Sequence, residues 1–143
     1  MEIPASFVLD SSLEVGRVYY IKAPELIQTD EPHYFIVIGI LEDNSYLLVS
    51  TTQLDKKIAW VRNRKIPDDT ICYIEPSSEN ELKKDSYLNC NSYHEVKNQF
   101  LIQKIESGEL VTKGIISDTD FEKIRNSIKQ SPLFDIPIEL ITK

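Results

Sequence analysis

The chain has 143 residues, of which 41% are apolar and 27% are charged, as in an ordinary soluble globular protein. This length is enough for one domain with its own core, which we expect to cover residues 1–143, and no stretch approaches the roughly 18 consecutive apolar residues that cross a bilayer. The net charge of -7 argues against nucleic acid as a partner on composition alone, because affinity for a polyanion comes largely from Lys and Arg contacts to phosphate.

The chain begins with a segment of weak pattern and then a first strand. Residues 1–15 show no sustained hydrophobic period and are expected to form a loosely docked lead-in. Because Glu2 stands where a signal peptide carries basic residues, we expect no secretory leader and a cytoplasmic protein. Residues 17–23 are rich in β-branched and aromatic side chains and stop at Pro24, which predicts a strand, and a polar loop follows over residues 25–32.

Two strongly apolar stretches come next. Residues 33–41 are almost continuously apolar, which is typical of a strand buried on both faces. A cluster of turn-forming residues over 42–45 leads into the second stretch, residues 46–53. We therefore predict an antiparallel hairpin at the centre of the fold, with polar and potentially reactive side chains at the strand ends.

The second half contains further stretches of strand length, which we expect at 56–67, 70–75, 86–96 and 99–105. Residues 77–85 have no clear pattern and fit either a short helix or a loop. Gly108 and Gly114 bracket what the sequence predicts to be a turn-rich connection.

A helix is predicted from about residue 117 to about residue 130. Ser117 is a suitable N-cap, Phe121, Ile124 and Ile128 fall on one face, and Pro132 ends the pattern. Residues 132–143 then form an apolar tail that must cover part of the core. Several short strands followed by one helix indicate a mainly β fold, a small antiparallel barrel over residues 16–131 with the helix packed on it.

Basic residues are concentrated in one short segment. Five of the sixteen lie between positions 56 and 65, namely Lys56, Lys57, Arg62, Arg64 and Lys65, and they flank Trp60. Such a cluster could bind single-stranded RNA through phosphate contacts and base stacking. The alternative is a solvated strand edge with Trp60 in the core.

The cysteines and histidines do not suggest a metal site. Cys72 and Cys90 are too few for a disulfide framework, lack the spacing of zinc ligands and are expected to be small buried hydrophobes. His33 and His94 are isolated from other candidate ligands. We predict neither a metal nor another cofactor.

Five segments together resemble the PemK/MazF toxins of bacterial toxin-antitoxin pairs, in the order in which that family carries them. They are residues 14–18, 33–38, 48–53, 86–91 and 114–131. The resemblance implies an SH3-like barrel that forms a homodimer, cleaves single-stranded RNA without a metal and is inhibited by a cognate antitoxin protein.

The resemblance also implies where the chemistry lies. Family members use an Arg at the mouth of one strand and a Thr at the end of the next. Thr51 takes the Thr place, whereas the Arg place falls to His33, or to Glu31 if Pro32 is matched to the family's Pro.

The missing Arg changes the expected mechanism. His cannot offer a permanent charge or a planar fork to a phosphate, but it can exchange a proton near neutral pH. We therefore expect His33 and Thr51 as catalytic residues, with Arg17 or Arg62 supplying the charge for phosphate. The alternatives are that His33 and Thr51 only satisfy local hydrogen bonds, and that the protein is a non-catalytic SH3-like interaction module whose acidic surface binds a protein partner.

Overall fold

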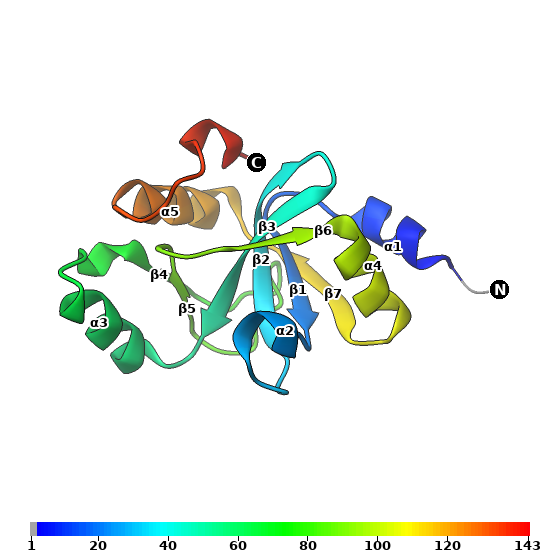
Figure 1. Cartoon of the computed structure of the whole chain (residues 1–143), viewed down its shortest axis with the longest axis horizontal. Coiled ribbons are helices and arrows are strands. Elements are labelled where there is room, and N and C mark those ends of the chain that lie inside the picture. The colour runs from blue at the N-terminus through cyan, green and yellow to red at the C-terminus, as the bar shows by residue number, and fades with distance from the viewer. Residues whose placement is uncertain (1–2) are drawn as a thin grey trace.

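A computed structural model describes residues 3–143 and shows a twisted antiparallel sheet with helices on both of its faces (Figure 1). The strands are β1 (Arg17–Ile21), β2 (His33–Leu41), β3 (Asn44–Thr51), β4 (Ile71–Ile74), β5 (Ser86–Asn89), β6 (His94–Lys97) and β7 (Leu110–Ile115). The α-helices are α1 (Ala5–Ser12), α2 (Pro24–Ile27), α3 (Leu54–Asn63), α4 (Asn98–Glu106) and α5 (Asp118–Lys129). Two short 3-10 helices are η1 (Asp68–Thr70) and η2 (Ile138–Leu140).

The sheet is open rather than closed into a barrel. Its strand order is β4-β5-β3-β2-β1-β7, and β6 pairs with β3 outside this path. Within residues 3–143 no pairing joins β4 to β7, so the expected barrel closure is absent. β3 is long enough to pair with β6 near its start and with β5 at its end, and the two partners share the same edge. The mainly β, antiparallel class is confirmed.

The predicted hairpin is the centre of the sheet. β2 and β3 pair antiparallel, with Phe35 opposite Val49 and Ile36 opposite Leu48. Side chains of β2 alternate between two apolar clusters, so that Ile36 belongs to one and Phe35 to the other. The almost continuous apolar run of this strand therefore reflects burial on both faces, as the sequence predicts.

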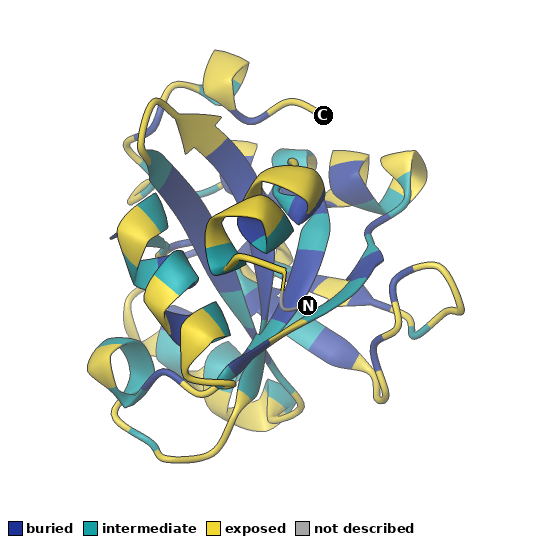
Figure 2. Ribbon diagram, turned by 90° about the vertical axis from the view of Figure 1, so that its right-hand side faces the viewer, coloured by how far each residue is buried: buried dark blue, intermediate teal, exposed yellow. Residues whose placement is uncertain are grey.

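Each face of the sheet carries its own core. On one face, α5 buries Phe121, Ile124 and Ile128 against β2, β4 and β5, as their spacing predicts. The tail adds Ile136 and Ile141 to this core, so the apolar tail does cover the sheet. On the other face, α1 and α4 cover β1 and β2, and the outer sides of these helices remain exposed (Figure 2).

Two expected strands are helices in the structure. Residues 54–63 form α3, because Leu54, Ile58 and Val61 recur at the helical spacing of four and three residues. Residues 98–106 form α4, which buries Leu101 and Lys104 on one side. The prediction of strands at 56–67 and 99–105 was wrong because short apolar runs fit either period.

Besides the expected polar loop over residues 25–32, which begins inside α2, two segments expected to be irregular also have regular structure. The lead-in contains α1, whose Leu9 is fully buried and whose Ser12 hydroxyl lies 2.8 Å from the Tyr19 hydroxyl. The predicted turn-rich connection after Gly108 contains β7, which pairs with β1 at the edge of the sheet. Neither was predicted because both depend on contacts with residues distant in sequence.

Candidate functional site

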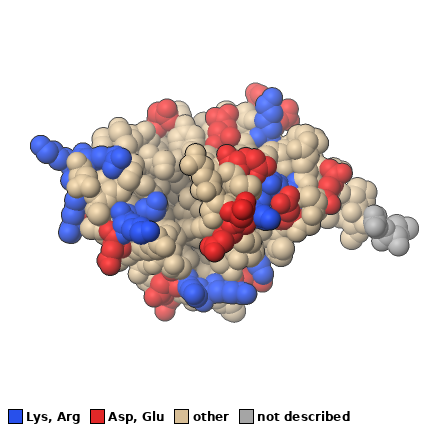
Figure 3. Space-filling view, turned by 60° about the horizontal axis from the view of Figure 1, so that its bottom comes forward, with Lys and Arg blue, Asp and Glu red and all other residues tan. Residues whose placement is uncertain are grey.

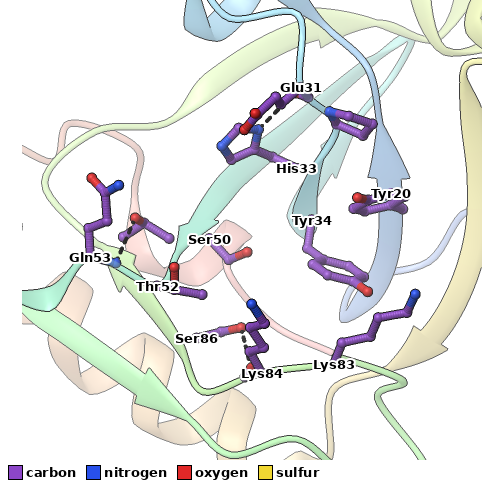
Figure 4. A pocket seen from close by; sticks show the side chains of 12 residues that line it. Tyr20, Glu31, His33, Tyr34, Ser50, Thr52, Gln53, Lys83, Lys84 and Ser86 are labelled. Carbon is purple, nitrogen blue, oxygen red and sulfur yellow. Dashed lines mark hydrogen bonds between the residues drawn. The ribbon is translucent and has the colours of Figure 1, made fainter.

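A cleft of about 400 Å³ lies at the end of the sheet where β1 and β3 finish and where β2 and β5 begin (Figure 4). It includes His33 and Thr51, the two residues predicted to carry the chemistry. The pairing of β2 with β3 ends at this side with Phe35 opposite Val49. Beyond that pair, His33 lies opposite Ile21 of β1 and Thr51 lies opposite Tyr87 of β5. Both predicted catalytic residues line the same cleft.

A hydrogen bond to the nearby backbone orients the His33 ring. Its Nδ1 lies 2.9 Å from the backbone oxygen of Glu31. Because a carbonyl oxygen only accepts, Nδ1 must donate, and in the neutral ring the lone pair then belongs to Nε2. Within residues 3–143 no side chain or backbone group forms a hydrogen bond with Nε2, so this nitrogen is available to a ligand.

Two neighbouring hydroxyls occupy different positions in the cleft. Successive strand residues point to opposite faces, so His33 and Thr51 share one face while Tyr34 and Ser50 share the other. Thr51 Oγ1 accepts a hydrogen bond of 3.1 Å from the backbone N–H of Gln53 at the rim. The Ser50 hydroxyl points into the middle of the cleft (Figure 4). Ser50 is thus a candidate that sequence reasoning missed.

Two lysines line the opposite wall. Lys83 and Lys84 belong to the segment between β4 and β5, and both have exposed side chains. In Figure 4 the Lys84 side chain points toward Ser50, while Lys83 runs beside Tyr34. Within residues 3–143, neither ammonium group has a carboxylate partner within 4.0 Å. The Lys-Lys pair, one residue before a predicted strand, was the available signal in the sequence.

Two tyrosines form one side of the cleft. The rings of Tyr20 and Tyr34 lie with their centroids 4.6 Å apart at an interplanar angle of 43°. Burial raises the pKa of Tyr34 above its usual value. The Tyr34 hydroxyl therefore stays protonated around neutral pH, and its half-exposed ring offers an aromatic surface inside the cleft.

Arg17 is not part of the cleft. Its guanidinium donates to the backbone oxygens of Ser12 at 2.7 Å and Lys113 at 3.0 Å, and it forms an ion pair with Glu14 at 3.0 Å. These bonds tie α1 and β7 to the start of β1. The charge that sequence reasoning assigned to Arg17 is therefore engaged elsewhere.

The predicted RNA-binding cluster forms a separate basic surface. Lys56, Lys57, Trp60 and Arg62 lie on α3, and Arg64 and Lys65 follow its end. Basic side chains gather at the left end of the molecule in Figure 3, where α3 lies, and the surface is hollowed between them and the acidic side chains to the right of the centre.

Two residues of this surface already have partners. Arg62 forms a bidentate ion pair with Asp68, with the shortest distance 2.7 Å, and this pair lowers the pKa of Asp68. The Arg64 guanidinium lies 4.2 Å from the centre of the half-exposed Trp60 ring. One face of the predicted stacking platform is therefore covered by an arginine.

Comparisons with known proteins do not identify a relative. No protein-family model matches the chain, and no curated protein matches it significantly. Among residues 3–143 no group of three or more His, Cys, Asp and Glu side chains could hold a metal ion. In the same part of the chain, no helix combines the length and the apolar character that a bilayer span needs.

Proposed function

We propose that the protein is a PemK/MazF-like endoribonuclease that cleaves single-stranded RNA, without a metal, in the cleft at the end of the β2–β3 hairpin. One observation carries the proposal. An imidazole with an available Nε2, several hydroxyls and two unpaired ammonium groups line the same cleft. Proton transfer, hydrogen bonding and positive charge are the three functions that cleavage of a phosphodiester by its own 2′-hydroxyl requires.

The reaction follows from these groups. His33 Nε2 accepts the proton of the 2′-hydroxyl, whose oxygen forms a bond to the adjacent phosphorus. The bond from phosphorus to the 5′-oxygen breaks, and that oxygen takes up the proton that the His33 imidazolium releases, directly or through water. The products are a 2′,3′-cyclic phosphate and a 5′-hydroxyl, so the atoms and charges balance without any other reactant.

The proposal also extends to the architecture and partners of that family. The central hairpin and the helix after β7 come in the chain order of the family's segments, although the sheet is open rather than closed into the barrel that the resemblance implies. A homodimer and an inhibiting antitoxin protein belong to the same proposal. Light scattering at tens of micromolar protein tests the homodimer, and a strict monomer would count against this part of the proposal.

The direct test is incubation of the purified protein with a mixed single-stranded RNA pool in EDTA. We expect cleavage that leaves cyclic phosphate ends. His33→Ala should slow it by about 10²-fold, the usual contribution of a general acid or base. Thr51→Ala and Ser50→Ala, compared side by side, show which hydroxyl contributes, and both variants should melt at the parent temperature because each removes one small polar side chain.

Two results would overturn the catalytic assignment. One is an RNA pool that stays intact from pH 6 to pH 9, and the other is a His33→Ala variant that cleaves as fast as the parent. The net charge of -7 would then favour a non-catalytic interaction module with a protein partner.

A further inference from the structure

Residues 75–85, the segment between β4 and β5, form a loop that brings Lys83 and Lys84 to the cleft; we call it the lysine loop. Their side chains enter from the wall opposite the end of β3, and Lys84 points toward Ser50 (Figure 4). Two such charges are either positioned for a ligand or merely solvated surface lysines. The internal structure of the loop distinguishes the two cases.

A buried asparagine organises the loop from inside. Asn80 is only 1% exposed, and its Oδ1 accepts hydrogen bonds from the backbone N–H groups of Ser77 at 3.0 Å and Leu82 at 2.9 Å. Its Nδ2 donates to the Glu75 backbone oxygen at 2.9 Å. Leu82, directly before Lys83, is buried in the core beneath α5. The backbone of the loop is therefore fixed close to both lysines.

The loop is also fixed to the far edge of the sheet. The Glu79 backbone oxygen accepts a hydrogen bond of 2.9 Å from the Ile115 N–H in β7. The approach is so close that a Cβ atom on Gly114 would lie 1.9 Å from the Glu79 oxygen. Only glycine fits at position 114 without displacing the loop. Two independent anchors thus hold the lysine loop in one position.

Cations on a fixed backbone lose little conformational freedom when a ligand binds, which is how preorganised sites gain affinity. Around them the cleft supplies the Ser50 and Ser86 hydroxyls, and Ser86 Oγ donates to the Lys84 backbone oxygen at 3.0 Å. The one carboxylate among the lining residues, Glu31, lies on the other side beside His33. Positive charge therefore exceeds negative charge along the lining of the cleft.

We infer that Lys83 and Lys84 form the phosphate-binding subsite of the cleft, for two successive phosphates of a single-stranded polynucleotide whose base contacts the Tyr34 ring. Lys84 binds the phosphate nearest His33, and Lys83 binds the neighbouring phosphate beside Tyr34. This inference rests on the proposed function, and it gives the lysine loop the role that the sequence assigned to Arg17 or Arg62. Both of those arginines are engaged in protein contacts.

The test uses a fluorescein-labelled single-stranded 2′-deoxy oligonucleotide, which lacks the attacking hydroxyl and stays intact. Fluorescence anisotropy is followed over a range of salt concentrations. Lys84→Gln and Lys83→Gln should each weaken binding by about tenfold or more, since each removes a charge-assisted hydrogen bond. Each should also reduce the slope of log affinity against log salt by about 0.7.

Matched variants separate position from total charge. Lys129→Gln removes the same charge from an exposed site on α5 and should leave affinity within about twofold, because this lysine does not line the cleft. Lys84→Arg should restore binding. Because both cleft lysines are exposed, all four variants should melt at the parent temperature.

The outcomes distinguish this inference from the function on which it rests. If Lys84→Gln and Lys83→Gln bind the oligonucleotide as the parent does, with an unchanged salt slope, the subsite is wrong, even if RNA is still cleaved. If they lose binding and the parent protein leaves the RNA pool intact, the phosphate subsite stands and the nuclease function fails. An equal loss of affinity in Lys129→Gln would show that net charge alone causes the effect, and it would overturn the inference.

Discussion

His94 gives the molecule a defined source of pH-dependent stability. It lies on β6 opposite Leu47, with its ring edge-on to Phe35 at a centroid distance of 6.1 Å. Burial lowers its pKa below the usual value, because a charged imidazole is poorly solvated among apolar side chains. The unfolded chain therefore binds a proton at this histidine at a higher pH than the folded protein does.

We predict that this contribution to stability is complete above the unfolded pKa of about 6.5 and is lost as the pH falls below it. Urea unfolding at pH 7.5 and pH 5.5 measures the loss. In His94→Gln the loss should be smaller than in the parent, since the titrating group is gone while the acidic residues are unchanged. An equal loss in both proteins would show that His94 does not titrate differently on folding.

Among individual residues, those on one side of the cleft could be predicted from the sequence, whereas those on the other side could not. His33 and Thr51 could be predicted because the family resemblance singled them out, and both line the cleft. Lys83 and Lys84 could not, since the position of their loop depends on the buried Asn80 and on the close approach of β7. The Asn80 hydrogen bonds lie within the loop, but the contact of Glu79 with Ile115 in β7 joins residues distant in sequence, whose proximity no local pattern predicts.

Helix α3 is the element whose charge can be tested separately from the cleft. It is a poorly buried helix, with Val61 as its one fully buried residue, and it starts directly after Gln53 at the cleft rim. If RNA leaves the cleft along this helix, Lys65→Ala should weaken RNA binding and lower the salt slope by about 0.7 for each phosphate that is no longer neutralised. Arg62→Ala should have a smaller effect, because Asp68 already pairs with that guanidinium.

The complementary variant is Asp68→Asn, which removes the partner of Arg62 and should strengthen binding. Anisotropy titrations of the three variants give these affinities, and the cleavage rate at saturating RNA should remain at the parent value. Unchanged affinity in Lys65→Ala and Asp68→Asn would mean that α3 is only a solvated surface.

The two helices that the sequence predicted as strands lack a clear apolar stripe. α3 and α4 are 10 and 9 residues long, and both mix apolar residues with lysines. In α4 even Lys104 is buried, where its ammonium pairs with Glu25 at 3.0 Å and Glu109 at 3.6 Å. A buried lysine with two partners breaks the apolar stripe by which a helix is recognised. By contrast α5 has a capping Ser117 and a regular apolar face, and its position could be predicted.

At the scale of the whole molecule, stability depends on the hairpin between the two cores. Val37 on β2 is fully buried, so Val37→Asp would place a carboxylate in an apolar interior. The cost of several kcal/mol is comparable to the ~5–15 kcal/mol by which a domain is stable, and we expect the variant to be unfolded at 25 °C. Circular dichroism and thermal melting measure this.

The control for that substitution is Val111→Asp on β7. The Val111 side chain is 47% exposed, so the same chemical change should cost less than about 1 kcal/mol. A Val37→Asp variant that melts with the parent would show that the hairpin is not the centre of the core.

The pairing of β1 with β7 affects how the chain folds as well as how the folded structure is stabilised. β1 meets β2 after a short connection, but its other neighbour comes from the opposite end of the chain, and Arg17 donates to Lys113, 96 residues away. Closing so long a loop is slow, and chains dominated by such distant pairings typically fold in milliseconds to seconds. During that interval β1 has one edge without a partner, and such an edge can pair with another copy of the chain. Refolding yield should therefore fall as protein concentration rises, which makes dilution the condition that most favours recovery of the native protein.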